Sequence, residues 1–494
     1  MSPIIIILFI LAYFLLLVGI SHFTSKGANN DAFFTGAHQS PWYLVAFGMI
    51  GASLSGVTFI SVPGWVASSE FSYMQMVLGY FVGYFVIATV LMPLYYRMNL
   101  TSIYTYLEER FGVYSYKTGA SFFLLSRTIG AAFRLFLVAQ TLQYLVFDKI
   151  TIYEDQTVPF WLTVMVTILL IWVYTFKGGI KTIVWTDTLQ TLFMLIAVGI
   201  SIYFISDQLN LSLSGLWDEV ENSKYSRVFF FDDWNDKRHF VKQFLSGAFL
   251  AIVMTGLDQD MMQKNLSCAN IKEGQKNMFS FSIVLIVVNF VFLVLGALLF
   301  IYANKNGIAI PEKTDNLFPE IAIHHLNSVA GVFFILGLVA AAYSSADSAL
   351  TALTTSVCVD FLDIKNKKEN IRTILRKRVH VIVSLVLFVV ILLFNGINKA
   401  SVISDIFRAA TYTYGPLLGL YAFGLMTKRK VIDKFVPIVA IASPLICFVL
   451  NLYSEQLFNG YKFGFEILIL NGAITFLGLL MLSVMQKEQT SPSN

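Results

Sequence analysis

At positions 340–348 the chain carries the run Ala-Ala-Ala-Tyr-Ser-Ser-Ala-Asp-Ser, inside a stretch that is otherwise apolar. Hydroxyl groups without partners are costly in hydrocarbon, so such a run faces protein, water or an ion. Helical spacing places one stripe of hydroxyls at Ser344, Ser348, Thr351 and Thr355, flanked by Ser345 and Asp347. The stripe is suited to a hard cation, but also to close packing of a second helix, because small residues let helices approach. The segment by itself leaves both interpretations open.

The composition indicates a polytopic membrane protein. The chain has 494 residues, of which 57% are hydrophobic and only 13% charged, and its mean hydropathy is +0.71. No soluble domain of this length needs so much apolar surface. The formal net charge of +4 is explained by basic loops and gives no reason to expect nucleic acid as a partner. No sequence feature requires a protein partner, and no haem, zinc or nucleotide motif is present.

Segments long and apolar enough to cross a bilayer recur along the chain. A spanning helix needs roughly 20 mostly apolar residues. By this criterion we expect thirteen spans, at 3–21, 42–67, 72–96, 117–147, 159–177, 184–206, 239–262, 277–302, 327–359, 379–396, 400–426, 432–453 and 463–485. The first lacks a basic leader and a cleavage site, so we interpret it as a retained helix.

Lysine and arginine concentrate in alternate loops, especially at 365–378 and 428–434. By the positive-inside rule these loops are cytoplasmic. The sequence therefore predicts an outer N-terminus, a cytoplasmic C-terminus and an odd number of spans in the cell (inner) membrane.

The second expected span is weakened at its centre. Residues 48–64 hold the glycines Gly48, Gly51, Gly56 and Gly64, the proline Pro63 and several hydroxyl residues. Where a helix is interrupted in the membrane, its freed carbonyl oxygens need protein, water or a cation. An ion site is the favoured interpretation, and a kink satisfied by neighbouring helices is the alternative.

Two ionisable groups lie within expected spans and each has two interpretations. Asp187, in the run 178–190, is either a functional carboxylate or a cap at a helix N-terminus. Arg127 either binds a substrate carboxylate or pairs with Asp187 or a helix end. Arg134 shares its helix face, since seven residues make about two turns.

The motifs together resemble the sodium:solute symporter family, which carries sugars, proline, sialic acid and iodide with sodium. The similar stretches are Gly-Gly-Ile-Lys-Thr-Ile-Val-Trp-Thr-Asp-Thr-Leu-Gln at 178–190, the run at 340–348, Ser-Gly to Pro-Gly at 55–64, and Tyr-Gly-Pro-Leu-Leu-Gly-Leu at 414–420. They occur in the family's order from about residue 40 to 430.

The resemblance implies a single all-α transporter domain with a LeuT-type core of two inverted five-helix repeats, each beginning with a broken helix. The repeats would be 42–206 and 239–426. The peripheral segments would be 1–41, with the first helix and an inner loop, the two helices within 432–485, and the tail 486–494.

The resemblance also implies a main sodium site between the second and ninth spans. Its ligands would be the carbonyls of Gly51, Leu54 and Ala341 and the hydroxyls of Ser344 and Ser345. Five oxygens without formal charge suit a readily exchanged monovalent cation rather than calcium. Some members bind a second sodium, which here would use Asp187, Ser345 and Ser348; Asp347 departs from that pattern, since some of those members have serine there.

Substrate is expected beside the broken second span, at Ser55, Thr58, Phe71, Gln75 and Arg127. The implied function is sodium-coupled uptake of a small polar solute by alternating access, the solute being a sugar, sialic acid or another carboxylate, or an amino acid. Two other classes remain open at this point: an intramembrane enzyme using Asp187 and Asp347, and a passive channel. We expect no enzyme, because neither aspartate lies in a Gly-x-Gly-Asp motif and no Ser/His pair falls within the expected spans.

Overall fold

The computed structural model describes residues 3–24, 39–153, 156–397 and 402–490; for some of these, including 174–179 and 181, only the backbone is described. The chain is almost entirely helical, as predicted, and one short hairpin pairs β1 (Thr151–Tyr153) with β2 (Gln156–Thr157). Most of the expected inner loop at 25–38 and the end of the tail at 491–494 lie outside the described residues.

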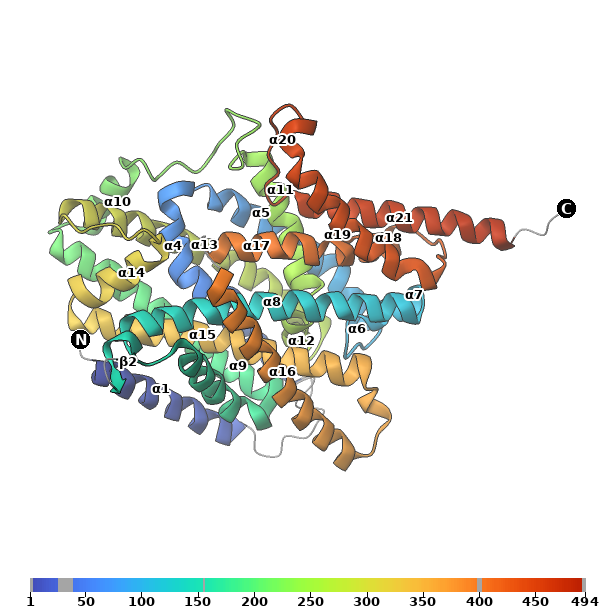
Figure 1. Ribbon diagram of the computed structural model, residues 1–494, viewed down its shortest axis with the longest axis horizontal. Coiled ribbons are helices and arrows are strands. Elements are labelled where there is room, and N and C mark those ends of the chain that lie inside the picture. The colour runs from blue at the N-terminus through green and yellow to red at the C-terminus, as the bar shows by residue number, and fades with distance from the viewer. Residues whose placement is uncertain (1–2, 25–38, 154–155, 398–401, 491–494) are drawn as a thin grey trace.

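Nine long helices form most of the molecule (Figure 1). Within the described residues they are α1 (Pro3–Thr24), α5 (Tyr73–Val86), α8 (Val113–Leu145), α9 (Phe160–Gln208), α13 (Ile271–Lys305), α15 (Ser328–Ser356), α16 (Glu369–Ile397), α19 (Val436–Leu452) and α21 (Ile467–Thr490). Side-chain caps start some helices: the Asn327 side chain accepts a hydrogen bond from Val329 N at the start of α15.

Three spans are interrupted. The second consists of α3 (Trp42–Ser53) and α4 (Gly56–Ser69), bent by 53°. The seventh consists of α11 (Phe240–Ala251), the π-helical turn η4 (Ile252–Gly256) and α12 (Gln259–Asn265), bent by 70°. The eleventh divides at Tyr414 into α17 (Val402–Thr413) and α18 (Gly415–Met426). All three interruptions fall within segments that the sequence marks with glycine or proline.

Short helices complete the connections. Short α-helices are α6 (Met92–Arg97), α7 (Thr105–Arg110), α10 (Leu213–Glu221), α14 (Leu317–Glu320) and α20 (Ser454–Leu457). Three-residue 3₁₀ turns are η3 (Phe147–Lys149), η5 (Thr314–Asn316), η8 (Ile364–Asn366) and η9 (Asp433–Phe435), and π-helical turns are η2 (Ile87–Leu91), η6 (Ile321–His325) and η7 (Val357–Phe361).

The structure does not confirm the expected number of thirteen spans. Among the described residues nine helices are long and apolar enough to cross a membrane, and the two bent pairs raise the number to eleven. Shorter apolar helices at Phe160–Val173 and Gly415–Met426 coincide with the other two expected spans. The expected fifth and sixth spans are joined in the continuous helix α9, since no proline interrupts residues 160–208.

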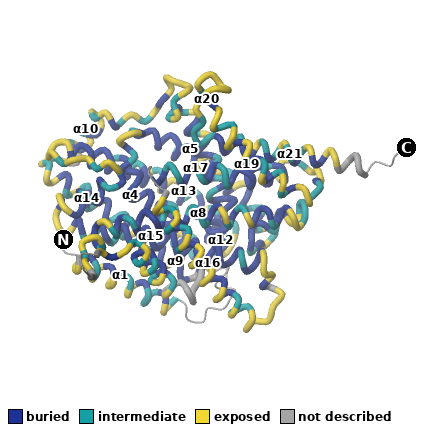
Figure 2. The backbone as a smooth tube through the Cα atoms, viewed as in Figure 1, coloured by how far each residue is buried: buried dark blue, intermediate teal, exposed yellow. Residues whose placement is uncertain are grey.

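The core lies where α4, α9 and α15 meet. Helix α15 packs against α9, and both contact the broken second span. A Cβ added at Gly337 of α15 would lie 2.7 Å from Ala197 Cβ of α9 and 3.0 Å from the Phe59 ring of α4. Figure 2 shows this centre as buried trace inside a rim of exposed residues. The exposed apolar side chains of the outer helices are those expected to face lipid.

Candidate functional site

The break between α3 and α4 frees backbone oxygens in the core. The last helical bond of α3 runs from Leu54 N to Ile50 O (2.8 Å), and the first of α4 from Phe59 N to Ser55 O (3.1 Å). Among the described residues, no backbone hydrogen bond reaches the carbonyls of Gly51–Leu54 from the following turn. The backbone at Leu54 leaves the helical conformation, with φ −82° and ψ 33°. The predicted interruption is therefore present, at the predicted residues.

Helix α3 lies directly on α9 at two glycines. A Cβ at Gly48 would be 3.0 Å from Asp187 Cβ, and one at Gly51 would be 2.3 Å from Thr191 Oγ1. The amide of Gly51 donates to Thr191 Oγ1 at 3.0 Å, while that hydroxyl is 2.8 Å from the carbonyl of Asp187. The end of α3 thus lies within one helical turn of the Asp187 carboxylate.

The hydroxyls of α15 approach the same carboxylate from the other side. Ser344 Oγ donates to Asp187 Oδ1 at 2.6 Å. Ser345 Oγ is buried and has no hydrogen-bond partner among the described residues. Ala341 lies one turn earlier and is also buried. The structure therefore brings Gly51 and Ser344 to neighbouring positions on α9, and α15 packs against α3. The Ser345 hydroxyl and the freed carbonyls of the break remain without a protein partner among the described residues.

The carboxylate of Asp187 forms an ion pair with a lysine of the same chain. Lys264 Nζ of α12 lies 2.7 Å from Asp187 Oδ2, and both side chains are only 1% exposed. Ser348 lies beside Asp187 and donates to Asp347 Oδ1 at 3.2 Å. Asp187 is deep within α9, so its interpretation as an N-terminal cap is wrong. Asp187 and Ser348, two of the three residues predicted for a second sodium, therefore lie together. Lys264, just beyond the expected span 239–262, binds the same carboxylate.

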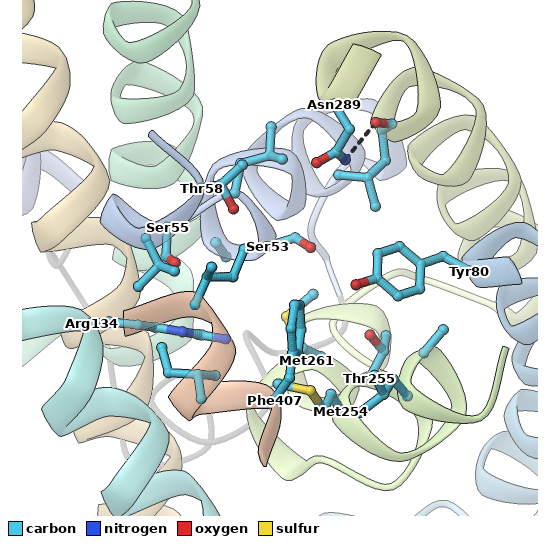
Figure 3. A pocket seen from close by; sticks show the side chains of 18 of the residues that line it. Ser53, Ser55, Thr58, Tyr80, Arg134, Met254, Thr255, Met261, Asn289 and Phe407 are labelled. Atoms are coloured by element: carbon cyan, nitrogen blue, oxygen red, sulfur yellow. Dashed lines mark hydrogen bonds between the residues drawn. The ribbon is translucent and has the colours of Figure 1, made fainter. Parts of the chain in front are cut away.

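A cavity opens beside the break. Figure 3 shows Ser53, Ser55 and Thr58 on one wall, Tyr80, Thr255 and Asn289 opposite, and Met254, Met261 and Phe407 below them. Ser55, Thr58 and Arg127 of the predicted substrate set line it, whereas Phe71 and Gln75 do not. The aromatic, hydroxyl and amide lining is typical of a pocket for a small polar ligand.

Phe71 and Gln75 form hydrogen bonds with the backbone of loop 222–239 and do not line the cavity. Gln75 Oε1 accepts from Phe230 N at 3.1 Å, and its Nε2 donates to the Arg238 carbonyl at 2.8 Å. The amide of Phe71 donates to the Arg227 carbonyl at 3.1 Å. Both ends of the Gln75 side chain are thus used by the backbone of loop 222–239. Sequence position beside the break did not reveal this contact, because the loop is 155 residues away.

The family assignment follows from comparison with known proteins. The sequence profile of the sodium:solute symporter family matches residues 33–432. The chain belongs to the sodium:solute symporter family. It is 25% identical to the sodium/sialic acid symporter NanT of Aliivibrio fischeri, over 83% of this chain and 80% of NanT. It is 23% identical to the sodium-coupled monocarboxylate transporter 2 of Bos taurus, over 81% of this chain and 64% of that protein.

Solved structures agree on the fold of this symporter. A Na⁺-coupled sialic acid symporter, solved in a substrate-bound outward-open state, superposes with a TM-score of 0.81 at 18% identity, covering 99% of each chain. A transporter of the nucleobase-cation-symport-1 family gives 0.55 at 13% identity, covering 92% and 94%. The predicted LeuT-type fold is confirmed, and the protein is a multi-pass membrane transporter that couples a small solute to sodium.

In this symporter Arg127 forms an ion pair within the protein and is not free to bind a substrate carboxylate. It pairs with Asp260 of α12, and both side chains are buried. Asp258, two residues earlier, accepts from Tyr414 Oη at 2.5 Å, and its other oxygen caps α12. Arg127 therefore pairs with neither Asp187 nor a free helix end. These contacts join α8 to the breaks of the seventh and eleventh spans.

Arg134 is the arginine that sequence reasoning passed over. It lies two turns along α8 from Arg127, and Figure 3 shows its guanidinium extending into the cavity. Its Nε is buried without a hydrogen-bond partner among the described residues, and no described carboxylate forms an ion pair with it. The seven-residue spacing gave the only signal, and it could not distinguish the paired arginine from the unpaired one.

Proposed function

We propose that the main sodium ion of this symporter is bound by the carbonyls of Gly51, Leu54 and Ala341 and the hydroxyls of Ser344 and Ser345. The break supplies carbonyls without helical partners, and the buried Ser345 hydroxyl lacks one as well. Ser344 gives its proton to Asp187, so its lone pairs remain for the ion. The buried, unpartnered Ser345 hydroxyl on α15, the helix that packs against both halves of the break, is the observation that carries the proposal.

The ion acts by holding α3 and α4 against α15. It shifts the conformational equilibrium only if it binds the outward-ready state more tightly than the inward one. Entry across 100 mV supplies about 2.3 kcal/mol, and a tenfold sodium gradient adds about 1.4 kcal/mol. For a neutral solute one ion thus supports accumulation by several hundredfold. The monovalent carboxylate proposed below crosses with the ion as a pair without net charge, so the sodium gradient alone drives it and supports about tenfold accumulation. A passive channel produces neither.

Replacing Ser345 by alanine tests the site. The variant removes one of five ligands, and losing a charge-assisted contact of about 1.5–3 kcal/mol raises the sodium concentration for half-maximal uptake roughly 10- to 100-fold. Uptake into proteoliposomes over a sodium series is the measurement. Ser201→Ala is the matched control, because Ser201 is buried and bonds only within α9, to the Ala197 carbonyl at 2.7 Å. Equal sodium dependence of both variants would contradict the proposal.

The solute is a small carboxylate, and Arg134 is its anchor. A half-buried guanidinium whose Nε is buried and that lines a polar cavity without a protein carboxylate needs an anionic partner, and its fork fits two carboxylate oxygens. The matched relatives are named for sialic acid and monocarboxylates, which agrees with this charge. Ser55, Thr58 and Asn289 then bind the neutral polar groups of the solute.

Binding of paired acidic and neutral solutes tests the anchor. We expect sialic acid or a short monocarboxylate to stabilise the purified protein in sodium, and the corresponding methyl esters to do so far less. Arg134→Gln should weaken acid binding at least about 30-fold, since truncating a buried charge pair costs about 2–5 kcal/mol. Arg408→Gln is the control, its side chain being 62% exposed on α17. A response confined to neutral solutes would assign Arg134 to helix packing.

Transport is inward through the cell membrane, with the N-terminus outside and the C-terminus in the cytoplasm. The two inverted repeats are 42–206 and 239–426, between peripheral segments at 1–41, 432–485 and 486–494. The positions of the two bent pairs, at the start of each repeat, support this division. The alternative of a paired-aspartate enzyme is disfavoured because Lys264 and Ser344 bind both oxygens of Asp187.

A further inference from the structure

Lys264 is an unusual side chain for this part of the molecule. It belongs to α12, after the 70° break of the seventh span, and it is among the largest fully buried side chains. A buried ammonium is costly unless a charge and hydrogen bonds compensate for the lost water. Here the compensation is Asp187 at 2.7 Å, whose other oxygen accepts from Ser344 at 2.6 Å. Both carboxylate oxygens of Asp187 are therefore engaged.

Hydrogen bonds fix the backbone around Lys264, so the fold determines the direction of the lysine side chain. Its carbonyl accepts from Ser267 Oγ at 2.7 Å. The neighbouring Asn265 donates to the Met261 carbonyl at 2.9 Å and accepts from Asn277 of α13 at 2.6 Å. These contacts hold the end of α12 against α13 and direct the lysine toward α9.

The ammonium competes directly with a second cation. A sodium ion bound by Asp187, Ser345 and Ser348 would lie next to the Lys264 Nζ in a dry environment. Two positive charges would then share one negative carboxylate, and little water is present to screen their repulsion. The single negative charge of Asp187 neutralises one cation, and that cation is the Lys264 ammonium.

We propose that the Lys264 ammonium permanently occupies the second cation position, so that this symporter carries one sodium ion per solute. The inference rests on the proposed main sodium site. Ser344 connects Asp187 to that site, because its hydroxyl donates a hydrogen bond to Asp187 and offers its lone pairs to the ion. Asp187 is thus a positioning residue for the main site, and Lys264 is the residue that sets the stoichiometry.

Removing the ammonium opens the position. Lys264→Met keeps the apolar length of the side chain and leaves Asp187 as an unpaired buried carboxylate, which a sodium ion then neutralises. Lys264→Met with Asp187→Asn removes both charges and closes the position again. Lys242→Met is the matched control: Lys242 is also buried on the seventh span, but its Nζ contacts the Lys462 carbonyl (3.5 Å) and the Tyr461 ring (3.9 Å).

The test is the ratio of radioactive sodium to solute entering proteoliposomes, together with the Hill coefficient of uptake for sodium. We expect a ratio and coefficient of about 1 for the unmodified protein and for Lys242→Met, about 2 for Lys264→Met, and about 1 again for the double variant. Should Lys264→Met not accumulate, Lys264→Gln gives the same comparison, because its amide hydrogen-bonds Asp187 without neutralising it.

The outcomes separate the two proposals. A ratio of 2 in the unmodified protein, or a ratio of 1 that Lys264→Met and Lys264→Gln leave unchanged, overturns the assignment of Lys264 and leaves the main site standing. Uptake that does not depend on sodium in the unmodified protein overturns the main site instead.

Discussion

At the scale of single residues, Gly51 shows why this chain needs glycine at the break. Its backbone supplies a proposed sodium ligand, so the ion itself does not require a missing side chain. The requirement comes from α9, where Thr191 Oγ1 would lie 2.3 Å from a Cβ at position 51. Gly51 N and Thr191 Oγ1 are joined at 3.0 Å, and that contact positions the end of α3 relative to Asp187.

A methyl group at position 51 tests this packing. Gly51→Ala should cost about 1–3 kcal/mol of stability by overpacking and should weaken sodium binding, because α3 is pushed away from α9. Adding Thr191→Ala removes the clashing atom and should restore most of the loss. The measurements are the melting temperature and its shift with sodium.

Gly199→Ala on α9 serves as the control for this series. A Cβ there meets nothing within 4 Å, so the change should be neutral or stabilising by up to about 1 kcal/mol. If Gly51→Ala behaves like Gly199→Ala, the contact with Thr191 does not limit the site.

At the scale of elements, the connection between α13 and α15 lies on the broken second span. A Cβ at Gly64 of α4 would be 2.7 Å from the Thr314 carbonyl of η5, and the rings of Phe59 and Phe318 are 5.3 Å apart. Asp315 in the same turn accepts from the amide of Val402, at the start of α17, at 3.5 Å. This connection therefore links α4 to α17, and a motion that separates those helices must break it.

The carboxyl of Asp315 makes this link sensitive to pH. Burial raises its pKa from 3.8 to about 6, against the lowering effect of the nearby Ser61 hydroxyl and Lys313, while Asp405 raises it further. Because the folded pKa is the higher one, this contribution is fully present below about pH 4 and is lost as the pH rises through 6. A shift of this size corresponds to about 3 kcal/mol.

Asp315→Asn should remove that dependence. We expect the unmodified protein to melt at a higher temperature at pH 5 than at pH 7.5 by a margin that shrinks in the variant. Asp207→Asn, a change at an exposed aspartate, should leave the margin as it is. An unchanged margin in Asp315→Asn would show that other groups cause the pH response.

At the scale of the whole molecule, the helices surround one buried centre (Figure 2). Figure 1 shows α1 beginning at one end of the long axis and α21 ending at the other. That arrangement agrees with the proposed outer N-terminus and cytoplasmic C-terminus. The alternating Lys and Arg content of the loops provides the independent argument.

Labelling of single cysteines tests the topology. The three native cysteines are buried in the structure, so they interfere little with a membrane-impermeant maleimide. A cysteine at the exposed Asn235 should react in intact cells, and one at the exposed Lys368 only after the membrane is permeabilised. The reverse pattern would invert the proposed orientation and the direction of uptake.

The sequence alone determined the membrane class, the interruption near Gly51–Ser55 and the hydroxyl stripe of α15. These features depend on local composition: apolar length requires a span, glycine weakens a helix, and buried hydroxyls need partners. Local patterns could not show that Phe71 and Gln75 anchor a loop, that α9 is continuous, or which arginine faces the cavity. Those properties depend on contacts between segments far apart in the chain.

Only the tertiary structure decided which charged side chains around the site are paired with one another. Asp187 and Lys264 are 77 residues apart, and Arg127 and Asp260 are 133 apart, so neither spacing is a pattern that helical periodicity can reveal. Folding brings each pair together in a dry core, where a charge must find a partner. Arg134 remains without a protein carboxylate among the described residues, and this difference between two arginines on one helix face became visible only once their neighbours were in place.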